Sequence, residues 1–123
     1  MTKILVVEDM IDNRELLSDI LQLHHYEVVE ANDGRVALEI ARRERPDLIL
    51  MDVSLPHLDG FAVTRQMKAD PYLANVPIIF VTAHAMGKEQ KMASEAGGDG
   101  YITKPIDIYS LLEQVKFFLT KAT

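Results

Sequence analysis

The chain has 123 residues, of which 48% are hydrophobic and 26% are charged, and this size suits a single compact domain over residues 1–123. Its net charge of −6 argues against a nucleic-acid-binding surface, because phosphate contacts need clustered lysine and arginine. Cysteine is absent, which fits a reducing compartment. The N-terminus has neither the apolar stretch of a signal peptide nor a membrane span, so we expect a cytoplasmic protein with no membrane partner.

The first predicted element is a strand over residues 4–7, an apolar run that ends at two acidic residues. A helix follows, with Asp12 or Asn13 as its predicted N-cap, because a side-chain oxygen there can accept a hydrogen bond from the free N–H groups of the first turn. Apolar residues continue at helical spacing. We expect this helix to end near the two histidines at 24–25.

The middle of the chain repeats the alternation of strand and helix. A strand is predicted over 27–31, and the Asn-Asp-Gly sequence at 32–34 opens a helix with an apolar stripe. The apolar run 48–51 is the third predicted strand. The next helix begins at 59–60 and stops before Pro71, because proline cannot continue the hydrogen bonding of a helix interior.

The last part of the chain contains two further strands and two further helices. Strands are predicted over 78–81 and 101–102, with a helix over 87–96 between them, and Asp107 is the predicted N-cap of the final helix. Continuous apolar runs of this kind are typical of strands covered on both faces. The alternation predicts an α/β fold with a doubly wound, five-stranded parallel sheet flanked by five helices.

Polar residues of particular kinds stand where the apolar runs end. Glu8 and Asp9 follow the first strand, and Asp52 follows the third. Thr82 follows the fourth strand, and Lys104 follows the fifth. In open α/β sheets the ligand site lies just beyond the carboxyl ends of the strands. We therefore expect three carboxylates, a hydroxyl and an ammonium to converge.

Three carboxylates in one place need a positive partner, since each pair of like charges a few ångströms apart costs about 4 kcal/mol at an effective dielectric constant near 20. Oxygen ligands without cysteine suit a hard cation such as Mg2+ (or Mn2+). A carboxylate beside a metal ion and the ammonium of Lys104 can receive a phosphoryl group, and aspartate is a known nucleophile for forming acyl phosphates. The hydroxyl of Thr82 could then donate a hydrogen bond to a phosphoryl oxygen.

With these residues the chain resembles the response regulator receiver domains of two-component signalling, and the resemblance covers the whole chain. The matching motifs, in chain order, are Glu8-Asp9, Asp52 at the end of DLILMD, Pro56 and Gly60, Thr82-Ala83, and Lys104-Pro105. The resemblance implies a flavodoxin-like sheet with strand order 2-1-3-4-5. It also implies a stand-alone, single-domain response regulator, since no output domain follows the last helix.

The resemblance implies a role for each residue of the charged cluster. Asp52 would be the phosphoacceptor. Asp9, Asp52 and the backbone carbonyl of Ser54 would bind Mg2+, with Glu8 acting through water. Lys104 would pair with the phosphoryl group, so that Asp52, Thr82 and Lys104 together would form the reacting site.

The resemblance also implies a conformational switch. Thr82 would shift on phosphorylation and Tyr101 would turn inward, altering the surface formed by the last two strands and the helices beside them. Ser54 and His84 occupy positions that would tune the lifetime of the phosphoryl group. The peptide bond before Pro105 is expected to be cis.

The implied partners are proteins of the same signalling system. A sensor or hybrid histidine kinase, or a histidine phosphotransfer protein, would donate the phosphoryl group, and a downstream protein target would recognise the switched surface. The chain would be a signalling phosphoacceptor that assists its own phosphorylation and dephosphorylation rather than an enzyme. It would be a monomer or a weak dimer.

Two alternative functions keep the same fold. A degenerate receiver could dock to proteins without phosphorylation, but such a form would be expected to lose Asp52, Lys104 or one of the acidic residues, and all are present. A phosphohydrolase with an aspartyl-phosphate intermediate would need a second catalytic aspartate shortly after the nucleophile. Val53 and Ser54 follow Asp52 instead, so no nearby acid is available to activate water.

Two further alternatives concern ligands. A flavin or nucleotide site would need a glycine-rich or Ser/Thr-rich loop after the first strand to bind phosphate, whereas Glu8 and Asp9 would repel it. A transition-metal site could combine His57 and His84 with Asp9 and Asp52, although histidines in such loops are more often solvated.

Overall fold

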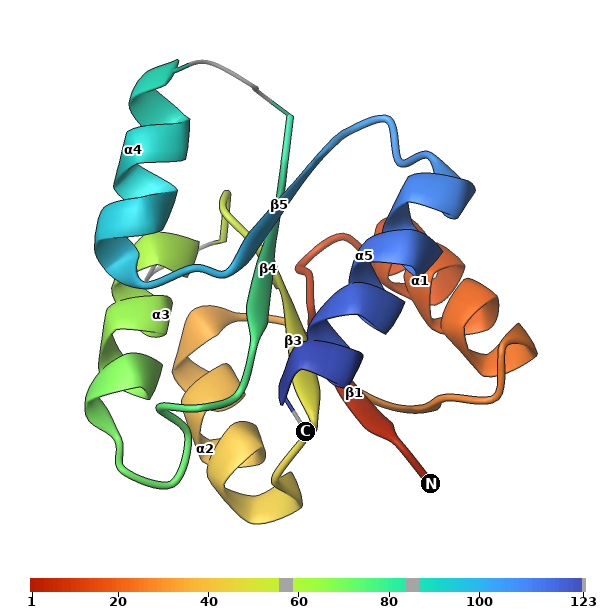
Figure 1. The fold of residues 1–123 in the computed structure, drawn as a ribbon, viewed down its shortest axis with the longest axis horizontal. Helices are drawn as coiled ribbons and strands as arrows, with labels where there is room; N and C mark the ends of the chain where they lie inside the picture. The colour runs from red at the N-terminus through yellow and green to blue at the C-terminus, as the bar shows by residue number, and fades with distance from the viewer. Residues whose placement is uncertain (56–58, 84–86, 123) are drawn as a thin grey trace.

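The computed structural model describes residues 1–55, 59–83 and 87–122. Parallel strands form a five-stranded sheet in the order β2-β1-β3-β4-β5 (Figure 1). The strands are β1 (Lys3–Val7), β2 (Glu27–Ala31), β3 (Leu48–Asp52), β4 (Ile78–Thr82) and β5 (Gly100–Thr103). The predicted fold class and strand order are confirmed.

Helices cover both faces of the sheet. The described helices are α1 (Ile11–Leu23), α2 (Gly34–Glu44), α3 (Gly60–Ala69), α4 (Gly87–Ala96) and α5 (Ile108–Ala122). α1 and α5 lie on one face, and α2, α3 and α4 lie on the other (Figure 1). The doubly wound arrangement that the alternation of elements predicts is therefore confirmed.

The strands β3, β4 and β5 each continue one residue beyond their apolar runs. Asp52 is the last residue of β3 and is in register with Val81 of β4. Thr82 is the last residue of β4 and is in register with Thr103 of β5. Because the sheet fixes their backbones, Asp52 and Thr82 are held more firmly than loop residues would be.

The core consists of two layers, one on each face of the sheet. Side chains alternate along each strand, so that Leu5 and Val7 pack toward α2, α3 and α4, whereas Ile4 and Val6 pack toward α1 and α5. Each of these four side chains is at most 1% exposed. Burying one such side chain contributes about 1.5–3 kcal/mol, so the central strands form a rigid support for the residues at their ends.

The N-terminal caps of α2 and α3 lie where the sequence predicts these helices to begin, whereas the cap of α1 does not. Asp33 and Asp59 accept hydrogen bonds from the first turns of α2 and α3. The prediction of Asp12 or Asn13 as the cap of α1 is wrong, because α1 begins at Ile11 after Met10. The Met10 N–H donates to a carboxylate oxygen of Glu8 at 3.2 Å, and this hydrogen bond fixes the backbone just before α1. Asp12 therefore lies inside the first turn, where its negative charge interacts favourably with the helix dipole.

An ion pair joins the end of α2 to the segment that follows α3. The Arg42 side chain is 57% exposed and its Nε donates to Asp70 Oδ2 at 2.6 Å, while the guanidinium of Arg45 lies 5.1 Å from the ring centroid of Tyr72. Asp70 also accepts the Tyr72 N–H at 2.9 Å. The hydrogen bond from Arg42, followed by that from the Tyr72 N–H, holds the pKa of the Asp70 carboxyl below its usual value.

We expect this pair to stabilise the fold at neutral pH and to weaken in acid. Because the pKa of Asp70 is lowered by folding, its contribution is fully present above its usual pKa of about 4 and is lost as the pH falls through the lower folded-state value. Asp70→Asn should therefore flatten the acid side of the curve of unfolding free energy against pH, measured by urea denaturation. Curves for wild type and Asp70→Asn that stay parallel below about pH 4 would contradict this expectation.

Candidate functional site

The carboxyl ends of the strands lie along one end of the sheet. There the backbone hydrogen bonds between strands continue into the first residues of the loops. The Glu8 N–H donates to the carbonyl of Ala31 at 3.0 Å, and the Lys104 N–H donates to the carbonyl of Thr82 at 2.7 Å. These hydrogen bonds fix the backbone positions of Glu8 and Lys104 just beyond the strand ends. The sheet therefore holds residues of four strands at one edge.

Glu8, Asp52 and Lys104 lie on the same side of that edge. The residues two positions before each of them all belong to the core layer beneath α1 and α5, and strand side chains two positions apart share a face. Lys104 Nζ lies 3.1 Å from Glu8 Oε1 and 3.8 Å from Asp52 Oδ1. The predicted convergence of ammonium and carboxylates is present.

The acidic residues form a cluster that fits a divalent cation. Glu8, Asp9 and Asp52 each offer a carboxylate oxygen, and these oxygens lie within 4.8 Å of one another. Glu8 and Asp52 are only 1% and 4% exposed, whereas Asp9 is exposed. Three carboxylates beside one ammonium leave two negative charges in excess (3 − 1), and a hard cation with oxygen ligands matches this donor set.

The backbone after β3 also contacts Asp52. The Ser54 N–H donates to Asp52 Oδ1 at 3.1 Å, and the Gly60 N–H donates to the carbonyl of Val53 at 3.1 Å. A Cβ atom at position 60 would lie 2.3 Å from the backbone oxygen of Asp52, which is closer than any real contact. Glycine is required at position 60 because the start of α3 approaches the backbone of Asp52 so closely.

We expect Gly60→Ala to damage the site as well as the fold. The added methyl group must push the start of α3 away from Asp52, which should lower the free energy of unfolding by about 1–3 kcal/mol. Displacing Asp52 should also weaken the binding of a divalent cation to the acidic cluster about tenfold or more, because groups that orient metal ligands set the metal affinity. Urea denaturation and calorimetric titration with Mg2+ measure the two effects. An unchanged affinity would show that Asp52 keeps its position.

Thr82 is the last residue of β4, beside β3 at the strand ends, and Tyr101 lies on the adjacent strand β5. Phe80 is in register with Tyr101, and Thr82 with Thr103, so Thr82 and Tyr101 are diagonal neighbours on adjacent strands. Tyr101 is partly buried against the core layer beneath α2, α3 and α4. Thr82 is 2% exposed. This arrangement brings the two residues predicted to form a switch to one face, next to α4.

Further predicted features concern the peptide bond before Pro105 and residues of the loops beside the acidic cluster. The peptide bond between Lys104 and Pro105 is cis, as expected. Ser54 is exposed and adjacent to the cluster through its N–H. Pro56, His57 and His84 lie outside the described residues, so the tuning role of His84 and the alternative transition-metal site stay predictions.

Arg14, which no motif in the sequence singled out, contacts the acidic pair. Its guanidinium Nη1 donates to the carbonyl of Glu8 at 2.9 Å and lies 3.5 Å from that of Asp9. The sequence signal for Arg14 was its position four residues after the Met10 N-cap. Residues four apart in a helix share one face, so this position places Arg14 on the same side of α1 as its start. That spacing does not reveal that the face of α1 carrying Arg14 is directed toward the end of β1.

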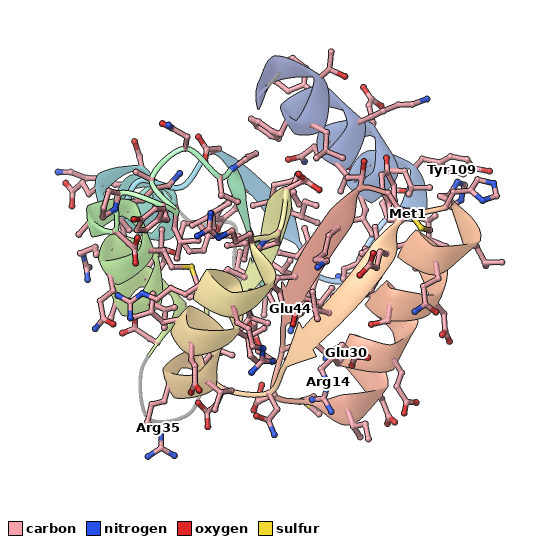
Figure 2. The ribbon with its side chains drawn as sticks, turned by 90° about the horizontal axis from the view of Figure 1, so that it is seen from below. Met1, Arg14, Glu30, Arg35, Glu44 and Tyr109 are labelled. Atoms are coloured by element: carbon pink, nitrogen blue, oxygen red, sulfur yellow. The ribbon has the colours of Figure 1, made fainter. Side chains whose placement is uncertain are left out.

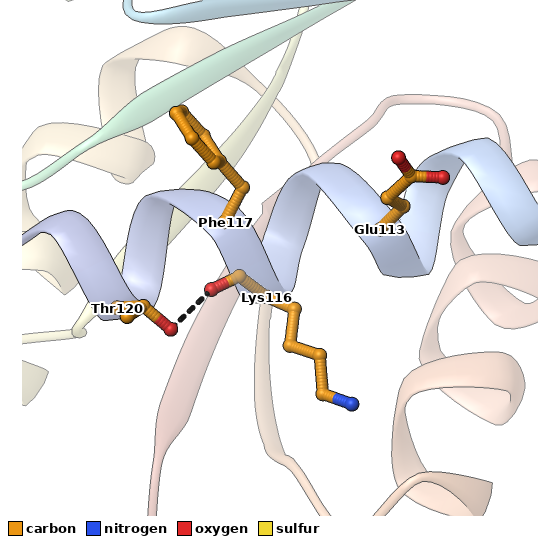
Figure 3. Close-up of a pocket in the computed structure, with 4 residues that line it drawn as sticks. All are labelled: Glu113, Lys116, Phe117 and Thr120. Carbon is orange, nitrogen blue, oxygen red and sulfur yellow. Dashed lines mark hydrogen bonds between the residues drawn. The ribbon is translucent and has the colours of Figure 1, made fainter.

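A shallow hollow of about 470 Å3 lies elsewhere, along α5, lined by Glu113, Lys116, Phe117 and Thr120 (Figure 3). The Thr120 hydroxyl donates to the backbone carbonyl of Lys116 at 2.9 Å, so helix hydrogen bonding already engages it. Phe117 forms an edge-to-face contact with Phe118 at 5.0 Å. This hollow offers no cluster of reacting groups comparable to that at the strand ends.

In the described part of the chain, none of the helices combines the length and apolar character that crossing a membrane requires.

A family model for the response regulator receiver domain matches residues 4–116. The chain belongs to this family. The receiver is similar to the polar-differentiation response regulator DivK of Brucella anthropi, with 39% identity over 119 residues that cover 97% of each protein. It is also similar to the solved structure of chemotaxis protein CheY4 of Vibrio cholerae, with 31% identity, a TM-score of 0.92, and coverage of 96% of this chain and 98% of that one.

A third similar structure is the receiver domain of a sensor histidine kinase of Pseudomonas aeruginosa, with 34% identity, a TM-score of 0.91, and coverage of 97% of this chain and 98% of that one. That structure has a magnesium ion coordinated in its active-site cleft. The comparisons confirm the predicted family and agree with phosphoacceptor signalling. They do not favour a degenerate receiver that only docks to proteins.

Proposed function

We propose that the receiver accepts a phosphoryl group on Asp52. One observation carries the proposal: the buried Asp52 carboxylate lies beside two further carboxylates and 3.8 Å from the Lys104 ammonium. A carboxylate at a fixed strand end, with an ammonium at one side and a place for a cation at the other, is suited to attack phosphorus. The cation and the ammonium would neutralise charge that develops on the phosphoryl oxygens.

The donor in this proposal is a phosphohistidine on a histidine kinase or a histidine phosphotransfer protein. An Asp52 carboxylate oxygen forms a bond to phosphorus, and the bond between phosphorus and the imidazole nitrogen breaks. The electron pair of the broken bond stays on the imidazole, which leaves neutral when its other nitrogen carries a proton. The free Asp52 is regenerated when water attacks phosphorus and releases inorganic phosphate.

The proposed cation is Mg2+ (or Mn2+), held by Asp9, Asp52 and the backbone carbonyl of Ser54, with Glu8 acting through water. The donor set on this chain supports this choice, and the magnesium ion of the Pseudomonas aeruginosa receiver agrees with it. When bound, the cation would offset the negative charge of the phosphoryl oxygens. Among the chain's own groups, Lys104 pairs with those oxygens and Ser54 N–H orients Asp52.

Phosphorylation is proposed to switch a surface that a downstream protein recognises. Thr82 would move toward the phosphoryl group and Tyr101 would turn inward beside it, since the two share one face of the sheet next to α4. Moving such a switch from mostly off to mostly on requires that phosphorylation favour the active form by about 5.5 kcal/mol. Ser54 and His84 are proposed to set how long the phosphoryl group persists.

The wider properties that we propose follow from this role. The receiver would act as a single-domain, cytoplasmic phosphoacceptor rather than as an enzyme with turnover on a separate substrate. It would be a monomer or a weak dimer and would not bind nucleic acid, in keeping with its net charge of −6.

Incubation with a small-molecule acyl phosphate, with Mg2+ or with a chelator, tests the proposal. Intact-mass measurement should show one added phosphoryl group only with Mg2+. Borohydride reduction of the acyl phosphate, followed by peptide mapping, should locate it at Asp52. A phosphohistidine donor and a beryllofluoride mimic extend the test. Failure of all three to engage the site would overturn the proposal in favour of docking without phosphorylation.

A further inference from the structure

Arg14 makes contacts that no other arginine of the described residues makes. Its side chain is only 16% exposed. Nη1 donates to the backbone carbonyl of Glu8 at 2.9 Å and lies 3.5 Å from that of Asp9. Nε donates to Glu30 Oε1 at 2.9 Å, and Figure 2 shows Arg14 of α1 and Glu30 of β2 side by side. Arg14 therefore bridges α1, β2 and the segment between β1 and α1.

The carbonyls that Arg14 contacts belong to the acidic pair itself. Glu8 and Asp9 have left the sheet, and the Glu8 N–H makes the last ladder hydrogen bond, to Ala31. Beyond that point the backbone is fixed by Arg14 and by the hydrogen bond from the Met10 N–H to the Glu8 carboxylate. A guanidinium is suited to this task because its planar fork presents several donors in fixed directions.

Glu30 anchors the guanidinium to a fixed strand. It is in register with Val6 of β1, two residues before Glu8, so it stands close to the strand end. Its carboxylate accepts from Nε while Nη1 faces the loop. A charge-assisted hydrogen bond of this kind holds the Arg14 side chain in one orientation.

We propose that Arg14 is a positioning residue that holds the Glu8-Asp9 backbone in the geometry that binds the divalent cation. This inference rests on the proposed function, since it concerns the cation that assists phosphorylation of Asp52. Groups that orient metal ligands without touching the metal commonly change metal affinity 10–100-fold when they are replaced.

The charge of Arg14 and its positioning role act in opposite directions on Mg2+ binding. A guanidinium near the site repels a cation, so removing its charge would by itself tighten Mg2+ binding. Loss of positioning would weaken binding, because the carboxylates would no longer be held together. Arg14→Gln, which removes the charge, therefore separates the two effects by the sign of the change in Mg2+ affinity.

Calorimetric titration of the folded receiver with Mg2+ alone is the test, without any phosphoryl donor. We expect Arg14→Gln to raise the dissociation constant for Mg2+ about tenfold. Glu30→Gln should change it in the same direction and by less, because the guanidinium keeps its contacts with the loop. Amide hydrogen exchange without metal should be faster at residues 9–10 in Arg14→Gln than in wild type.

Arg43→Gln is the matched control, since Arg43 is exposed on α2 and pairs only with the neighbouring Glu44 among the described residues. It should leave the Mg2+ dissociation constant unchanged. Unchanged or tighter Mg2+ binding in Arg14→Gln would overturn the inference, and so would a loss of unfolding free energy alone. If Arg14→Gln does not fold, Arg14→Lys decides, because it keeps the charge and removes the planar fork: weaker Mg2+ binding supports the inference, and an unchanged dissociation constant overturns it. A wild-type receiver that does not bind Mg2+ would overturn the proposed metal site as well.

Discussion

Asp52→Asn is expected to abolish the phosphoryl adduct completely. The amide lacks the negative oxygen that bonds to phosphorus, and no second carboxylate at the site shares the fixed position of Asp52 at the end of β3. Intact mass after incubation with an acyl phosphate and Mg2+ provides the measurement. The variant should stay folded without Mg2+, because it removes one of three clustered like charges.

Asp12→Asn is the matched control for this result. It makes the same chemical change in an exposed residue of the first turn of α1, outside the acidic cluster. The control should form the adduct at the wild-type rate. An adduct that persists in Asp52→Asn and maps to another residue would show that the phosphoacceptor has been assigned wrongly.

Lys104→Gln is expected to slow formation of the adduct about 100-fold, in line with the loss of a single charge-stabilising donor from a reacting site. Lys104 is the cation that the structure places between Glu8 and Asp52, at 3.1 and 3.8 Å. Without it, an added phosphoryl group would lie close to the charge of Glu8, which is 1% exposed, and would lose the ammonium that faces Glu8 and Asp52. The initial rate of mass increase with an acyl phosphate measures the effect.

Two controls distinguish this effect from unfolding or metal loss. Lys104→Gln should still bind Mg2+, because all three carboxylates remain. Lys116→Gln, on the exposed side of α5, should react at the wild-type rate. A Lys104→Gln rate within about threefold of wild type would exclude a direct role for the ammonium.

Local patterns in the sequence were enough to predict most of the fold. Apolar runs bounded by turn residues identify buried strands, and helical spacing with Asp33 or Asp59 at the start identifies helices, because these signals depend on neighbouring residues alone. The start of α1 was predicted wrongly for the same reason. Its position depends on a hydrogen bond from Met10 to the Glu8 carboxylate, which a capping preference does not contain.

The sequence by itself also determined which residues stand at the strand ends. Only the tertiary structure decided how they pair. Lys104 contacts Glu8 across 96 positions of the chain, and across the ends of β3 and β4, because both side chains leave the sheet on the same face. Arg14 meets the acidic pair because α1 folds back over the strand end. Such contacts depend on the packing of whole elements, which no local pattern in the chain encodes.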